Sequence, residues 1–66
     1  MIDPMIRLPA VLQATGLNKT RLYALQRNGR FPRGVKISER AVAWPVRDIQ
    51  DWIAARIAER DEGTAA

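Results

Sequence analysis

Residues 17–29 read LNKTRLYALQRNG, and this segment contains both the start and the stop signals of one short helix. Asn18 is a residue type that caps the first turn of a helix through its side-chain oxygen. At the other end, Asn28-Gly29 terminates the helix, because both residue types tolerate the left-handed conformation that closes a helix. We therefore predict a helix over residues 19–28.

A shorter helix is predicted just before it. Pro9 suits a first helical turn, apolar side chains recur at helical spacing, and Thr15-Gly16 ends the pattern after about two turns. Two short helices joined by a tight glycine turn form a helix-turn-helix arrangement. The alternating residues 5–8, in front of the first helix, are compatible with an edge strand.

A hairpin and a third helix are predicted after residue 30. Residues 33–37 and 41–44 alternate in the manner of strands around a turn at 38–40, and Pro45 bars the second strand from continuing. An apolar stripe at helical spacing then predicts a helix that reaches about Arg60; its members are Ile49, Trp52, Ile53 and Ile57.

The predicted fold is therefore mainly α with a small β-hairpin. Three helices plus a wing make a winged helix-turn-helix, and we assign residues 1–60 to this DNA-binding domain and residues 61–66 to a flexible C-terminal tail. A chain of 66 residues leaves no room for a second domain.

The composition argues against most kinds of catalysis and metal binding. The chain has no Cys and no His, which removes thiolate nucleophiles, imidazole bases and the usual zinc ligands, so we predict no enzyme activity, no metal and no cofactor. Asp48 and Asp51 are better explained by the positive end of the third helix dipole than by catalysis. The longest apolar run, residues 41–46, is far too short for a bilayer span, which favours a soluble, cytoplasmic protein.

The charge is unevenly distributed. Residues 1–40 contain eight basic and two acidic side chains, a net charge of +6, whereas residues 41–66 carry a net charge of −2. Such asymmetry indicates a polyanionic partner, nucleic acid before membrane; the alternative is a solvated surface that is basic by chance.

The outer face of the helix at 19–28 suits DNA. Thr20, Tyr23, Ala24 and Arg27 lie opposite the apolar face that Leu22 marks, and their hydroxyl, phenol and guanidinium groups bond phosphates and base edges. The candidate DNA-binding residues, including the basic residues that flank this face and the wing, are Asn18, Lys19, Thr20, Arg21, Tyr23, Arg27, Arg30, Arg33, Lys36 and Arg40. The alternative for each cation is an ordinary exposed charge.

The large aromatic residues are Phe31, Trp44 and Trp52, and two roles are open to them. One role is stacking on the bases of single-stranded nucleic acid, and the other is filling the hydrophobic core. A chain this small has few large apolar groups, and Trp52 lies on the apolar stripe, so we predict that all three belong to the core.

An ordered set of segments resembles the AlpA-type prophage regulators. These segments are Arg7–Leu12, Thr15–Leu17, Lys19–Tyr23, Gly29–Pro32, Val35–Ile37, Arg40–Trp44 and Ile49 with Trp52-Ile53, within residues 5–60. Members of this family are small winged helix-turn-helix proteins akin to phage excisionases and MerR-like regulators. The resemblance implies a sequence-specific DNA-binding protein of a phage, prophage or mobile element.

The resemblance also implies roles for particular segments. Residues 18–23 and Arg27 correspond to the recognition helix in the major groove, and residues 36–40 correspond to a wing on the flanking backbone or minor groove. Arg21 stands where the family commonly has a small hydroxyl residue, which predicts different base preferences. Glu39 in the wing turn would be repelled by phosphate, which argues against deep insertion into the minor groove.

The leading interpretation is a transcriptional regulator that binds double-stranded DNA. We expect it to self-associate or to assemble cooperatively on DNA, because one module of this size buries little surface.

One alternative is an excisionase-like factor that binds tandem sites beside an integrase, whereas a regulator acts near RNA polymerase. The number and spacing of footprints on DNA discriminate these two functions. An alternative of another class is a protein-interaction module that inhibits a host regulator. It predicts binding without DNA, with an affinity that depends only weakly on salt. RNA binding is the third interpretation.

Overall fold

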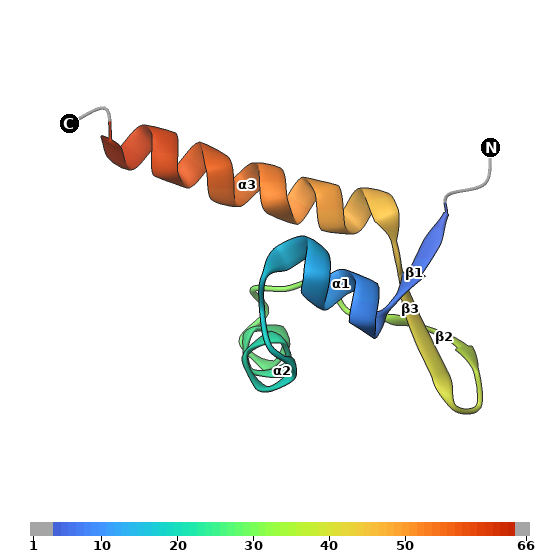
Figure 1. Ribbon diagram of the computed structural model, residues 1–66. Helices are drawn as coiled ribbons and strands as arrows, with labels where there is room; N and C mark the ends of the chain where they lie inside the picture. Colours follow the sequence, from blue (N-terminus) through green and yellow to red (C-terminus); the bar gives the residue numbers. More distant parts are fainter. Residues whose placement is uncertain (1–3, 65–66) are drawn as a thin grey trace.

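The computed structural model describes residues 4–64, along which six elements follow one another (Figure 1). They are β1 (Met5–Arg7), α1 (Leu8–Thr15), α2 (Lys19–Arg27), β2 (Val35–Ser38), β3 (Ala41–Pro45) and α3 (Val46–Thr64). The strands form one antiparallel sheet in the order β1-β3-β2, so β1 is an edge strand and extends the predicted hairpin. Three helices and a small sheet confirm the predicted fold class.

The turn between α1 and α2 forms as predicted. Gly16 has a φ of 74°, in the left-handed region that favours glycine, and its N–H donates to the carbonyl of Leu12 at 2.8 Å. The hydroxyl of Thr15 donates to the carbonyl of Val11 at 2.8 Å, the bond to residue i−4 that threonine side chains form in helices.

The second helix has the predicted start and ends one residue earlier than predicted, because Asn28 is its C-cap. Gly29 takes the left-handed conformation, with φ at 71°. The backbone N–H groups of Gly29 and Arg30 donate to the carbonyls of Gln26 and Leu25, at 3.1 and 2.8 Å. This pair of bonds is the Schellman arrangement, which closes the helix and redirects the chain toward the wing.

The helix start at Asn18 leads to a stability prediction. The side-chain oxygen of Asn18 accepts the backbone N–H of Arg21 at 2.7 Å. We expect Asn18→Ala to lower the free energy of unfolding by about 1 kcal/mol, because that N–H loses its cap. Thermal unfolding followed by circular dichroism measures the effect, and Asn18→Asp, which preserves the acceptor, is the control. Equal losses in both variants would contradict the capping role.

The third helix is longer than predicted. It begins at Val46, directly after Pro45, but continues to Thr64 rather than ending near Arg60. The predicted tail at 61–66 is thus helical over its first four residues, and its last two lie outside the described residues. Polar residues such as Glu59, Arg60 and Glu62 are good helix formers, so an apolar stripe that stops at Ile57 does not end the helix.

One core joins every element except β2. Ile6, Val11, Leu22, Trp44 and Ile49 contribute from β1, α1, α2, β3 and α3 in turn, and the loop after α2 adds Phe31. Trp44 and Phe31 are buried, at 1% and 5% exposure, which confirms their predicted place. This shared core fixes how the helix-turn-helix sits against the sheet.

Candidate nucleic-acid interface

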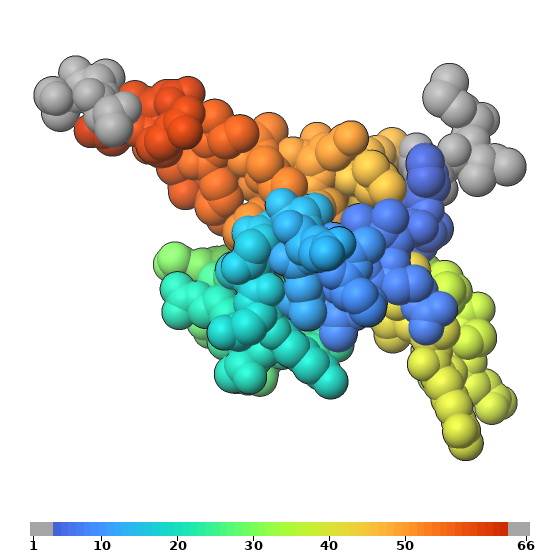
Figure 2. All heavy atoms as spheres, viewed as in Figure 1, coloured from blue at the N-terminus to red at the C-terminus, as the bar shows by residue number. Residues whose placement is uncertain are grey.

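The second helix and the wing project from the same side of the molecule. Figure 1 shows α3 lying across the opposite side, while α2 and the tip of the β2–β3 hairpin both point away from it. Figure 2 shows these as two separate protrusions, with the body of the domain between them. Such a pair of protrusions suits a helix in one groove of a duplex and a hairpin on the neighbouring backbone.

The loop between these two protrusions is held by three side-chain hydrogen bonds. The carbonyl of Pro32 accepts from Gln26 Nε2 at 3.1 Å and from Trp44 Nε1 at 2.9 Å. The carbonyl of Arg30 accepts from Trp52 Nε1 at 2.7 Å. The relative position of α2 and the wing is therefore fixed by the helices and strand around the loop. Gln26 is not among the predicted site residues, although a polar residue on the inner side of a short helix is a signal for such a contact.

The residues predicted on the outer face of α2 differ in how far their side chains are exposed. Thr20 and Arg27 are exposed, and Ala24 between them is partly buried. The side chain of Tyr23 is partly buried and packs against the core, so its role as a DNA contact stays a prediction. It follows directly after the fully buried Leu22, so its bulky ring reaches the core from the edge of the helix.

The predicted cations are available for an external partner. The side chains of Lys19, Arg21, Arg27, Arg30, Arg33, Lys36 and Arg40 are exposed, and within residues 4–64 no hydrogen bond or ion pair occupies them. On α3, by contrast, Arg56 binds Glu59 at 2.7 Å and Arg60 binds Asp61 at 2.9 Å. Exposed cations without an internal partner among residues 4–64 are therefore concentrated on α2, the loop and the wing.

The wing is open to a partner along its length. All four residues of β2 are exposed, and so are both turn residues, Glu39 and Arg40. Lys36 pairs with Val42 across the hairpin, and the pairing shifts between Lys36 and Ser38. The carboxylate of Glu39 stands at the tip, where the predicted repulsion from phosphate would act.

Arg21 lies on the flank of α2 rather than on its outer face, and Arg30 lies in the loop just after α2. Both line a small groove of about 440 Å³ together with Ala24 and Asn28. Both also line a larger groove toward α3, where Trp52 forms part of the wall. Trp52 packs against the core as predicted but is only partly buried, with its ring edge-on to Phe31 at 5.0 Å between centroids.

A helix-turn-helix combined with a projecting hairpin defines the class of winged helix-turn-helix proteins. Residues 4–57 match the model of the family described as "Prophage CP4-57 regulatory protein (AlpA)", and the chain belongs to this family. A relative from Enterobacteria phage P4, "Uncharacterized protein ORF88", is 38% identical over 61 residues, covering 92% of this chain and 69% of the relative. The resemblance to AlpA-type regulators is confirmed, and the chain is a regulatory protein of phage or prophage origin.

No helix among residues 4–64 has the length and apolar character that crossing a bilayer requires.

Proposed function

We propose that this chain is a sequence-specific DNA-binding protein that regulates transcription and acts without catalysing a reaction. In this mode α2 lies in the major groove, with Thr20 and Arg27 toward the base edges, and the β2–β3 wing lies on the flanking backbone. Such a regulator acts in the cytoplasm, where it meets phage or host DNA. Membership of a phage regulatory family supports this function.

The observation that carries the proposal is the contrast between two sets of cations. Seven exposed cations of α2, the loop and the wing have no internal partner among residues 4–64, whereas the cations late in α3 are paired with carboxylates. Exposed cations that repel one another in the free protein gain most from a polyanion, because each phosphate contact also releases a condensed counterion. Lys36 and Arg40 belong to this set and support the wing as a backbone contact.

The proposed mode leads to a salt dependence that can be measured. If roughly five cations contact phosphates, the logarithm of the association constant falls against the logarithm of salt concentration with a slope of about −4 to −5. Fluorescence anisotropy with a labelled duplex measures this slope. We expect Lys36→Ala to reduce its magnitude by about 1 without changing base preference. A slope near zero would instead favour a protein-interaction module.

A further inference from the structure

An open groove of about 880 Å³ lies between the flank of α2 and the middle of α3. Its lining is apolar where Leu25, Phe31 and Trp52 contribute, and cationic where Arg21 and Arg30 do. These two guanidinium groups have no internal partner among residues 4–64. Such a groove matches an occupant that carries carboxylates beside an apolar side chain.

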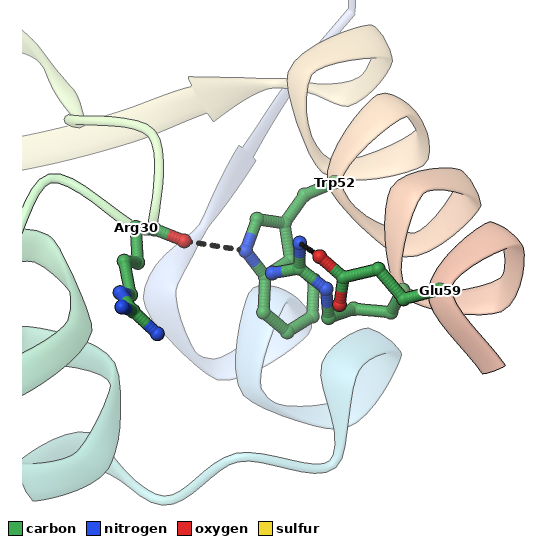
Figure 3. Close-up of polar contacts among 4 residues, drawn as sticks. Arg30, Trp52 and Glu59 are labelled. Atoms are coloured by element: carbon green, nitrogen blue, oxygen red, sulfur yellow. Dashed lines mark hydrogen bonds and ion pairs between the residues drawn. The ribbon is translucent and has the colours of Figure 1, made fainter. Parts of the chain in front are cut away.

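The α3 wall of the groove is electrically balanced. Arg56 places its guanidinium carbon 5.0 Å from the centroid of the Trp52 ring, and its Nη2 binds Glu59 at 2.7 Å. Figure 3 shows Trp52 between Glu59 on one side and Arg30 on the other, with the indole N–H directed at the Arg30 carbonyl. The uncompensated charge of the groove therefore comes from Arg21 and Arg30.

The end of α3 has the chemistry that fits this groove. Ile57 is 45% exposed, although it continues the stripe that is buried at Ile49. The exposed carboxylates of Asp61 and Glu62 follow within two turns, and that of Asp61 also binds the neighbouring Arg60. In Figures 1 and 2 the last turns of α3 extend beyond the rest of the described chain, so this segment is accessible to another molecule.

We propose that the groove receives the acidic end of α3 from a second copy of this chain. Ile57 covers the apolar lining, while Asp61 and Glu62 face Arg21 and Arg30. The donor segment, residues 57–62, overlaps the α3 wall of the groove, which ends at Glu59, so donor and acceptor lie at the same end of the molecule. A two-fold axis then places each acidic end in the groove of the other copy, and the assembly closes as a dimer.

The expected dimer is weak and sensitive to salt. The contact is confined to one end of a small domain, which corresponds to the low end of specific interface sizes. Its ion pairs lie at an open groove and are screened by added salt. Binding of two copies at neighbouring DNA sites would raise their effective concentration and favour the dimer.

Charge reversal tests the pairing in the absence of DNA. The acceptor variant is Arg21→Glu with Arg30→Glu, and the donor variant is Asp61→Lys with Glu62→Lys. Glu at position 21 near the start of α2 and Lys near the end of α3 complement the helix dipoles, whereas Arg30 lies in the loop after α2. Circular dichroism checks that each variant keeps its helices. The matched control is Arg33→Glu with Lys36→Glu, which changes the net charge as the acceptor variant does but lies outside the groove.

Sedimentation velocity over a concentration series gives the result. We expect the wild type and the control to form dimers at high concentration and low salt, and each groove variant to dimerise at least about tenfold more weakly. An equimolar mixture of the acceptor and donor variants should restore the dimer, because one contact then joins the reversed charges and the other keeps the wild-type pairs. A monomeric wild type, growth beyond a dimer, variants that associate like wild type, or a mixture that stays monomeric would each overturn the proposal.

Discussion

Trp44→Ala is expected to unfold this domain. Trp44 is 1% exposed and belongs to the largest fully buried side chains of the described residues. Its removal creates a large cavity in the core and costs about 3 to 5 kcal/mol. It also leaves the Pro32 carbonyl without its indole donor. The expected loss is comparable with the total stability of a domain of this size, roughly 3 to 10 kcal/mol at typical values per residue. Urea denaturation followed by circular dichroism measures it.

Trp52→Ala is the matched control for this experiment. The same residue type is removed, but Trp52 is only partly buried and lines the open groove, so we expect a loss in the ordinary range of about 0.5 to 3 kcal/mol. Trp52→Ala should therefore still show a cooperative transition. The burial described above would be contradicted if Trp52→Ala were the more damaging of the two.

Arg27→Ala and Thr20→Ala are expected to change which DNA sequences the protein selects. Both side chains are exposed on the outer face of α2. In the proposed mode they reach base edges, and the loss of one good base contact relaxes discrimination at that position by about 1 to 3 kcal/mol. Selection from a random duplex library, followed by sequencing, measures the preference at every position of the site.

The control for this selection is Arg60→Ala, which also removes one cation. Arg60 lies on α3 and is paired with Asp61, so we expect the wild-type sequence preference to persist. Circular dichroism should show that all three variants keep their helices, because alanine is a strong helix former and none of these positions is buried. If Arg27→Ala and Thr20→Ala fold normally and select the wild-type sequences as strongly, α2 is not the recognition helix.

Local signals were sufficient for the predicted elements. Gly16 and Gly29 both adopt the left-handed conformation where the two helices were expected to end, and Asn18 caps the helix that it was expected to begin. These features depend on a few adjacent residues, as does the break at Pro45. Element types and order were therefore predictable from the sequence.

Features that depend on contacts between distant residues were not predictable. Trp44 and Trp52 were both predicted to belong to the core, yet the first is fully buried and the second lines an open groove. Tyr23 lies on the predicted outer side of α2, but the core lies close enough to receive its ring. Arg21 faces the groove toward α3, and the helical angle of one residue does not reveal a neighbouring helix.

The hydrogen bonds at Arg30 and Pro32 bear on how such a protein changes its target. They hold the connection between α2 and the wing at both carbonyls, using side chains that do not lie on the outer face of α2. In the proposed mode, α2 contacts bases and the hairpin contacts phosphates. The distance along the duplex between these two sets of contacts is then constant. Substitutions at Thr20 or Arg27 can alter the preferred bases, while the length of the DNA site contacted by one copy stays the same. A lineage of phage regulators with this connection would diversify in sequence preference sooner than in spacing.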